Sequence, residues 1–261
     1  MPEKLLIERD GPVAVITLNM PETLNALTDT DLCEDLAAAL RDLEADLSIG
    51  CAVLTGAGKA FSSGGNVKHM LERSGIFEGD VLDIRDNYRA GIQRLAKAVW
   101  GCDLPIIAAV NGAAYGAGCD LTCMCDIRIA SQEAQFAENF VRVGLISGDG
   151  GGWLLPRTVG LSRACEMSYT GDPIDAETAL AWGLVSKVVA AEALLDEAKA
   201  LAARIARNPA RQLRMTKRLL REGQVTRYDS LLELAAAYQG ASHHSADHEA
   251  AIAALLARKK P

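Results

Sequence analysis

The sequence lacks several features that would assign it to a common class of protein. No apolar run approaches the roughly 20 residues that a membrane-spanning helix needs, so we expect no membrane association. The N-terminal MPEKLLIERDG mixes acids with bases and has no long apolar core, which is not the pattern of a secretory signal. Basic residues are fewer than acidic ones, 27 against 34, and the net charge of −7 argues against broad binding to nucleic acid.

A disulfide framework is also missing. The seven cysteines are an odd number without framework spacing, and this suits a reducing cytoplasm. Cys119, Cys123 and Cys125 have a C-x3-C-x-C spacing that is poor for zinc, and no histidine is near them in the sequence. We interpret them as buried free thiols and predict no metal site.

The composition is that of a globular protein. The chain has 261 residues, of which 49% are hydrophobic, enough for one large domain or a domain with an appendage. Segments with strand and helix patterns alternate up to about residue 190, including one long helix predicted over 81–100. Everything after Ala190 has a helical pattern. This order predicts an α/β core over residues 1–190 and a helical region over 191–261.

The central stretch of the chain is 111–126, with the sequence NGAAYGAGCDLTCMCD. An apolar, strand-like run at 105–110 leads into it, and the pattern predicts a strand, a tight turn and a helix whose first turn lacks bulk. Such a helix start offers unpaired backbone N–H groups to an anionic oxygen. Close packing of the helix on the strand, with Asp120 as a surface acid, is the alternative interpretation.

A second small-residue loop, GAGKAFSSGGN, occupies 56–66. It is not a phosphate-binding P-loop, because GxxxxGK[ST] is absent. It is either a flexible turn or a second backbone that faces a ligand.

Several stretches resemble the crotonase family, also called the enoyl-CoA hydratase/isomerase superfamily. They are AFSSGGNVKHM, NGAAYGAGCDLTCMCDIRIAS, VGLISGDGGGWLLPRTVG and TGDPIDAETALAWGLVSKVV, and they fit in order and spacing along nearly the whole chain. The resemblance implies a spiral of ββα units over 1–190 and a C-terminal helical region, 191–261, that mediates trimerisation. It implies a homotrimer or a hexamer built as a dimer of trimers.

The resemblance also implies the ligand and the groups that hold it. The substrate would be a coenzyme A thioester, with no cofactor beyond the coenzyme A that it carries. The backbone N–H groups of Gly65 and Ala117 would bind the thioester oxygen, although Ala117 departs from the usual glycine. Gly65, Asn66, Val67 and Lys68 would run along the CoA moiety, with Lys68 as a candidate for its phosphates.

The catalytic acids expected from the resemblance are Asp120 and Asp149. Asp120 stands where hydratases of the family usually carry their first glutamate, and Phe140 stands where they carry the second. Asp149 is the nearest replacement for that second acid, or a turn acid between glycines. Two acids beside one acyl chain suit proton transfer. Glu138 is a further candidate, which we interpret more readily as an edge or loop acid.

Two more features have alternative interpretations. Phe140 and Trp153 either line the acyl pocket or belong to the ordinary core. A basic run extends over 204–221, and because some members of the family bind RNA, an RNA site is one interpretation of it. A solvated helix face or salt bridges between subunits is the preferred interpretation. The run contains Arg204, Arg207, Arg211, Arg214, Lys217, Arg218 and Arg221.

The leading hypothesis from the sequence is an enzyme that acts on a 2-enoyl-CoA thioester, most simply an enoyl-CoA hydratase. An enoyl- or dienoyl-CoA double-bond isomerase is the first alternative. Another reaction of the family, such as thioester hydrolysis or ring opening, and a CoA- or RNA-binding scaffold without turnover are the others. The family suggests a place in fatty-acid β-oxidation.

Overall fold

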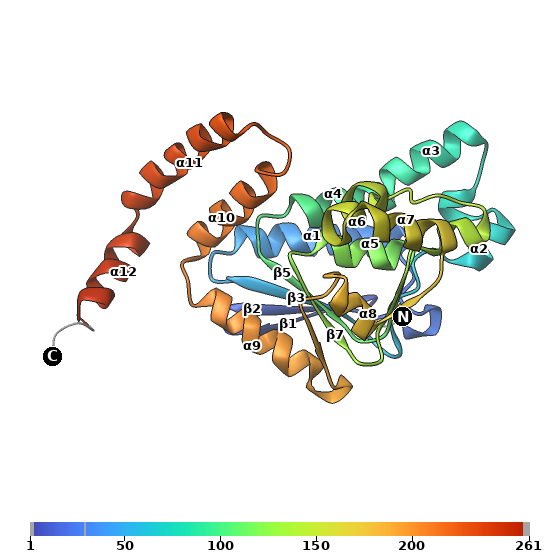
Figure 1. Ribbon diagram of the computed structural model, residues 1–261, viewed down its shortest axis with the longest axis horizontal. Coiled ribbons are helices and arrows are strands. Elements are labelled where there is room, and N and C mark those ends of the chain that lie inside the picture. The colour runs from blue at the N-terminus through green and yellow to red at the C-terminus, as the bar shows by residue number, and fades with distance from the viewer. Residues whose placement is uncertain (1–2, 29, 258–261) are drawn as a thin grey trace.

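Two sheets and the helices around them make up the computed structural model, which describes residues 3–28 and 30–257 (Figure 1). The larger sheet has the strand order β1 (Leu5–Asp10), β2 (Val13–Leu18), β3 (Cys51–Gly56), β5 (Ile106–Val110), β7 (Ile127–Ser131), β10 (Lys187–Val189). The smaller sheet has the order β4 (Ala60–Ser62), β6 (Ala113–Tyr115), β8 (Gln135–Ala137), β9 (Ile174–Asp175). Pairing is parallel except for β1 with β2 and β8 with β9.

The chain repeats one supersecondary unit. A strand of the larger sheet is followed by a strand of the smaller sheet and then by a helix. This order recurs as β3–β4–α2 (Val67–Glu72), β5–β6–α5 (Ala117–Met124) and β7–β8–α6 (Gly151–Val159), with the short helix η3 (Asn139–Val143) before α6. These are the ββα units expected from the sequence. The central stretch departs in one detail, because β6 lies between the predicted strand and the predicted helix.

The central strands β2, β3 and β5 of the larger sheet are buried on both faces, which explains why they are continuous apolar runs in the sequence. Along β3, Ala52 and Leu54 join the core on the side of α1 (Thr30–Ala45), while Cys51 and Val53 join a second core against α9 (Leu194–Ala206). Side chains alternate between faces along a strand. The chain after Ala190 is helical, as predicted, yet α9 packs on the sheet with the residues before 190 (Figure 1).

The long helix predicted over 81–100 is wrong in one respect. The structure has two helices, α3 (Val81–Ala90) and α4 (Ile92–Gly101), separated at Gly91 with φ −94° and ψ −106°. The apolar spacing continues across the break, so the periodicity alone does not reveal it. The remaining helices are η1 (Pro21–Thr23), η2 (Gly75–Phe77), α7 (Leu161–Thr170), α8 (Ala176–Ala181), η4 (Ala191–Ala193), α10 (Ala210–Glu222), α11 (Tyr228–His243) and α12 (Ala246–Ala257).

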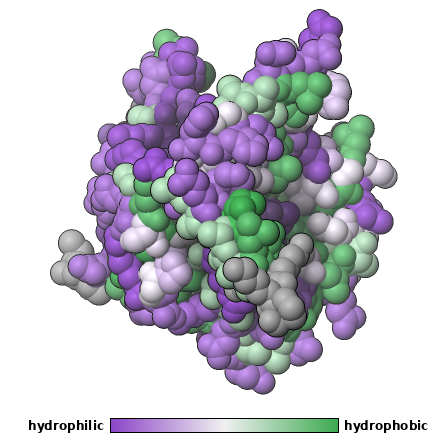
Figure 2. Space-filling view, turned by 90° about the vertical axis from the view of Figure 1, so that its left-hand side faces the viewer, coloured by the Kyte–Doolittle hydropathy of each residue, from purple (hydrophilic) through white to green (hydrophobic). Residues whose placement is uncertain are grey.

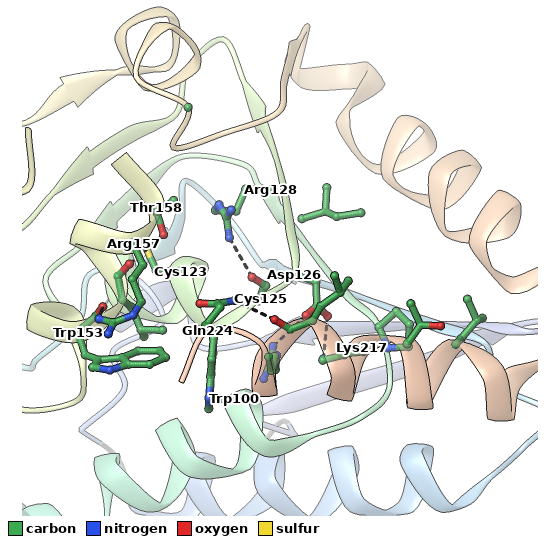
Figure 3. A pocket seen from close by; sticks show the side chains of 18 residues that line it. Trp100, Cys123, Cys125, Asp126, Arg128, Trp153, Arg157, Thr158, Lys217 and Gln224 are labelled. Atoms are coloured by element: carbon green, nitrogen blue, oxygen red, sulfur yellow. Dashed lines mark hydrogen bonds and ion pairs between the residues drawn. The ribbon is translucent and has the colours of Figure 1, made fainter. Parts of the chain in front are cut away.

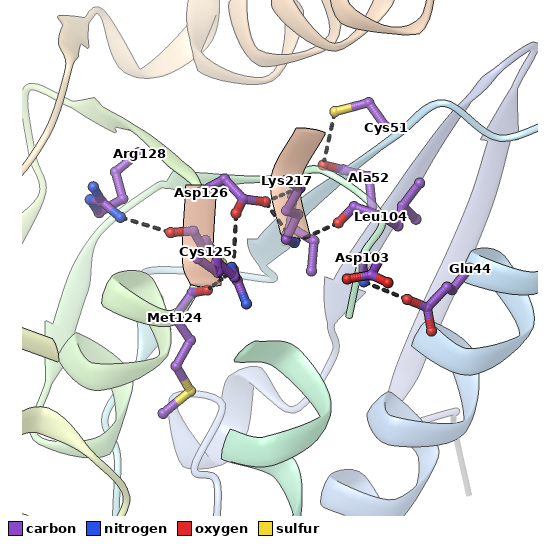
Figure 4. Close-up of polar contacts among 12 residues, drawn as sticks. Glu44, Cys51, Ala52, Asp103, Leu104, Met124, Cys125, Asp126, Arg128 and Lys217 are labelled. Atoms are coloured by element: carbon purple, nitrogen blue, oxygen red, sulfur yellow. Dashed lines mark hydrogen bonds and ion pairs between the residues drawn. The ribbon is translucent and has the colours of Figure 1, made fainter. Parts of the chain in front are cut away.

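The basic run is not simply a solvated face, which corrects part of the preferred interpretation. Lys217 and Arg214 are buried, and Lys217 Nζ lies 2.7 Å from Asp126 Oδ2 and donates to the Leu104 carbonyl (Figure 4). Arg221 bonds the other oxygen of Asp126 at 2.9 Å. These basic groups therefore anchor α10 to the core. Within residues 3–28 and 30–257, no helix combines the length and the apolarity needed to cross a bilayer.

Candidate active site

The two small-residue loops meet beside one pocket. A Cβ on Gly64 would lie 2.9 Å from the Ala117 nitrogen and 2.4 Å from the Tyr115 carbonyl oxygen, so only glycine permits this approach, and its φ is +77°. Gly65 and Ala117 both line a pocket of about 80 Å³. Within the described residues, neither backbone N–H has a hydrogen-bond acceptor. Two free amide donors therefore border one cavity.

Asp120 lies in the first turn of α5 and is fully buried. Its Oδ2 accepts a hydrogen bond of 2.9 Å from the Ser147 hydroxyl, and that hydroxyl accepts one of 2.9 Å from the Gly151 N–H. Ser147 thus satisfies the first amide of α6 and holds one carboxylate oxygen. Asp120 Oδ1 has no partner within the described part of the chain. The surface-acid interpretation of Asp120 is excluded.

Asp149 lies in the loop that leads into α6, and it lines the same pocket as Gly65 and Ala117. It is 6% exposed, and its Oδ2 is buried without a partner among the described residues. The loop that carries Asp149 is short, because η3 extends to Val143 and α6 begins at Gly151. The structure therefore brings Asp120 and Asp149 together beside the two free amides.

A third acid joins them. Glu138 follows β8, is 3% exposed, and approaches Asp120 across the space that Gly151 leaves open. A Cβ on Gly151 would lie 2.0 Å from Asp120 Oδ1 and 2.3 Å from Glu138 Oε1. The structure places Glu138 in the loop between β8 and η3, as the loop interpretation has it, but buried beside Asp120. The burial of Glu138 depends on tertiary packing, and no local sequence pattern predicts it.

The three carboxyls hold protons more tightly than isolated acids do. Burial raises the pKa of Asp120 well above its usual value, and the charges of Asp149 and Glu138 raise it further. Burial likewise raises the pKa of Glu138, to about 8, and that of Asp149. A proton on Asp120 opposes the last two shifts by hydrogen bonding to either neighbour. Such clusters separate acid and base roles between neighbouring carboxyls.

The other residues predicted at the site are divided between the pocket wall, the start of α2 and the surface. Phe140 and Val67 line the pocket, while Asn66 caps α2 by accepting from the Lys68 N–H at 3.0 Å. The Lys68 side chain is exposed. Further apolar and aromatic residues that the motifs did not single out also line the pocket. They are Met70, Ile76, Phe77, Tyr88, Ile92, Val143 and Leu145.

Trp153 lines a different cavity, of about 580 Å³, between α4, α6 and α10 (Figure 3). Its ring meets Trp100 edge-on at 5.0 Å, and the Arg157 guanidinium lies 4.0 Å above it. The structure therefore places Phe140 with the acids and Trp153 away from them. Among residues 3–28 and 30–257, no group of three or more His, Cys, Asp or Glu side chains is arranged to hold a metal ion.

The pocket, its two free amides and its buried acids agree with the kind of known protein that this chain is similar to. Residues 8–261 match the model of the enoyl-CoA hydratase/isomerase family. The 1,2-epoxyphenylacetyl-CoA isomerase of Escherichia coli K12 is 36% identical, covering 100% of this chain and 98% of its own. The crotonyl-CoA hydratase of Syntrophomonas wolfei is 34% identical, covering 99% and 96%. The crystal structure of an enoyl-CoA hydratase from Bacillus anthracis superimposes with a TM-score of 0.91 at 29% identity, covering 99% and 98%.

The chain belongs to the enoyl-CoA hydratase/isomerase family. The resemblance to the crotonase family is thereby confirmed, and so is the expected α/β fold with a helical C-terminal region. The family is one of enzymes, and its named relatives include both hydratases and an isomerase.

Proposed function

We propose that this enzyme is an enoyl-CoA hydratase, which adds water reversibly across the double bond of a 2-enoyl-CoA thioester. The observation that supports the proposal is one pocket bordered by the free amides of Gly65 and Ala117 and by the carboxyl of Asp149. The amides suit the thioester oxygen, and the carboxyl suits a proton that moves near Cα and Cβ. Coenzyme A enters as part of the substrate.

In this proposal, the Gly65 and Ala117 amides act on the charge that develops during reaction. Addition of water at Cβ places negative charge on the thioester oxygen, as an enolate. Donors that are already fixed stabilise that charge without rearranging, and loss of one such donor typically costs about 3–4 kcal/mol. The start of α5 adds a favourable partial charge.

Asp149 would carry the proton. As the water oxygen bonds to Cβ, the Asp149 carboxylate takes one proton from the water, and the electron pair of the double bond moves to the enolate. Return of that proton to Cα completes the addition, so that water is consumed and the carboxylate is restored. Asp120, which accepts a hydrogen bond from Ser147, would orient the Asp149 carboxyl and favour its ionised form by hydrogen bonding to it.

The coenzyme A moiety would follow Gly65, Asn66, Val67 and Lys68. Gly65 and Val67 line the pocket, and the Lys68 side chain stands exposed just beyond it, within reach of solvent and of a phosphate. Phe140 would contact the acyl chain.

Double-bond isomerisation is the second candidate, and a specific observation favours it. The acid among the residues that line the pocket is Asp149, while Phe140 occupies another part of the wall. A single base can remove a proton from one carbon of a 3-enoyl-CoA and return it two carbons away, whereas hydration by two separate acids would need a second carboxyl at the substrate.

The test is incubation of the purified protein with crotonyl-CoA in H2(18)O, followed by mass spectrometry. Incorporation of 18O at Cβ, lost in Asp149→Asn, would support hydration by this site. Retention of full 18O incorporation in Asp149→Asn would exclude the assigned role. A double-bond shift in 3-enoyl-CoA without 18O incorporation would establish the isomerase instead.

We also propose that α10–α12 mediate assembly into a homotrimer, or a hexamer of two trimers. Large apolar side chains of this region are exposed in the single chain, and Figure 2, viewed from the side of α11 and α12, shows hydrophobic residues gathered there. They include Leu220, Val225, Leu232, Ile252, Leu255 and Leu256. A reducing cytoplasm is the proposed compartment, since the buried Cys51, Cys102, Cys119, Cys123 and Cys125 form no disulfide in the described part of the chain.

A further inference from the structure

Glu138 has no part in the proposed chemistry, yet its surroundings are unusual for an acid. It is 3% exposed, its Oε2 has no hydrogen-bond partner within the described residues, and its Oε1 faces Asp120 across Gly151. An acid that served only to keep β8 soluble would face water. A buried carboxyl with an orphaned oxygen requires a physical reason.

No cation compensates this acid. In the part of the chain that the structure describes, no lysine, arginine or histidine forms an ion pair with Glu138, Asp120 or Asp149. The titratable groups that interact with Glu138 are Cys119, Asp120 and Cys123 of α5 and Asp149 of the following loop. All of these groups are neutral or negative. Three carboxylates so placed cannot all be ionised, because each charge is desolvated and repelled by the others.

We propose that Glu138 is a positioning residue of the active site, which works in its neutral form by leaving the proton of Asp120 free for Asp149. The inference rests on the proposed function of Asp149. While Glu138 is neutral, the proton of Asp120 is free to hydrogen-bond to the Asp149 carboxylate and hold it towards the pocket. An ionised Glu138 becomes a competing acceptor for that same proton, so Asp149 loses its support.

The pH at which Glu138 ionises follows from its burial. Burial raises its pKa to about 8, with the charges of Cys123 and Asp149 acting in the same direction. Glu138 is therefore mostly neutral at neutral pH and ionises just above it. Tyr88, which faces Asp149 from α3, has its own pKa raised by burial and stays neutral over this range. The rate should accordingly fall as pH rises through about 8.

The test compares Glu138→Gln with the native enzyme. Glutamine keeps the shape and a hydrogen-bond donor but cannot ionise. We expect native kcat/KM to fall about tenfold for each pH unit above the transition, and the Glu138→Gln variant to lack this fall. Glu133→Gln, an exposed acid of the same segment, is the matched control and should keep it. An unchanged alkaline fall in Glu138→Gln would overturn the proposal, because a merely structural residue would leave the fall in place.

A measurement without substrate separates this inference from the proposed function. Infrared difference spectra in D2O detect the C=O stretch of a protonated carboxyl. We expect a component of this band to titrate near 8 in the native protein and to be missing in Glu138→Gln, while the component from protonated Asp120 remains. Absence of the component near 8 in the native protein would overturn the neutral form of Glu138. A band with the expected titration but no turnover of any enoyl-CoA would instead overturn the proposed function, and the positioning role with it.

Discussion

The Ser147 hydroxyl donates to Asp120 Oδ2 at 2.9 Å, and so it ties the first turn of α5 to the first turn of α6. Asp149 lies in the short segment between Ser147 and α6. One serine therefore fixes both the buried acid and the loop that presents the pocket-facing acid. Catalytic groups need such supports because small displacements cost much of the rate.

Removal of this support should slow the enzyme without unfolding it. Ser147→Ala deletes a donor to Asp120 and an acceptor for the Gly151 amide, and a hydrogen bond of this kind is worth about 1 kcal/mol. We expect kcat/KM to fall roughly tenfold. Ser186→Ala, which removes an exposed hydroxyl bonded to the Arg128 carbonyl, should leave the rate unchanged. Equal rates for both variants would contradict the role of Ser147.

A methyl group on Gly151 should disable the site. It would lie 2.0 Å from Asp120 Oδ1 and 2.3 Å from Glu138 Oε1, distances that force both acids to move. We expect Gly151→Ala to lose at least about 100-fold in kcat/KM, as misplaced catalytic groups do. The neighbouring Gly152 has open space around its Cα, so Gly152→Ala is the matched control. Steady-state kinetics with circular dichroism of both variants separates loss of geometry from loss of fold.

The stability of the protein should decrease as pH rises from 4.5 to about 8. The pKa of Glu138 is raised from 4.5 to about 8, so over this window the folded protein holds a proton that the unfolded chain releases. The Glu138→Gln variant has no such proton to hold, so its stability should lack this decrease. At about pH 8 its free energy of unfolding should exceed that of the native protein by roughly 2–4 kcal/mol. Urea unfolding at both ends of the window measures the difference. A difference that did not grow with pH would contradict the shifted pKa.

The buried Arg214 should be essential for attachment of α10. Its guanidinium donates to carbonyl groups around the end of α1 and to one in its own helix. These acceptors belong to Leu43, Glu44, Asp46, Ile49 and Ala210. Arg214→Ala should lower the free energy of unfolding by roughly 3 kcal/mol, since several buried acceptors lose their donor. Arg211→Ala, at an exposed position of the same helix, should change it little.

A charge on the last helix should disrupt assembly. Leu255 is 51% exposed on α12, and Leu255→Asp would place a carboxylate on the apolar surface proposed to contact other subunits. Light scattering coupled to gel filtration should show a shift from trimer or hexamer to smaller species. Leu161→Asp, at an exposed site on α7, is the control. A native protein that is already monomeric would contradict the assembly proposal.

The alternation of elements was predictable because the central strands β2, β3 and β5 are buried on both faces and are therefore continuous apolar runs in the sequence. The break at Gly91 was not, since the spacing of Tyr88, Ile92 and Leu95 suits one continuous helix. A glycine costs a helix only about 1 kcal/mol, so its presence alone predicts no break.

The site was predictable to the extent that local motifs carry it. The meeting of the two small-residue loops and the pairing of Asp120 with Asp149 agree with the order of the motifs. The burial of Glu138 depends on α5 and the segment before α6, which surround it only in the folded chain. The interior role of Arg214 depends on carbonyls about 170 residues earlier. Charge patterns cannot reveal such partners.

The anchors of α10 have a consequence for how the protein is made. In the described part of the chain, the ion pairs that fasten the C-terminal helices to the rest of the protein involve Glu197 and Lys199 of α9 and Lys217, Arg218 and Arg221 of α10. All of these residues precede the end of α10, so they leave the ribosome before α11 and α12 do. The part of the chain up to the end of α10, which contains the candidate active site, can therefore fold first. The apolar surfaces of α11 and α12 emerge when that part is already folded.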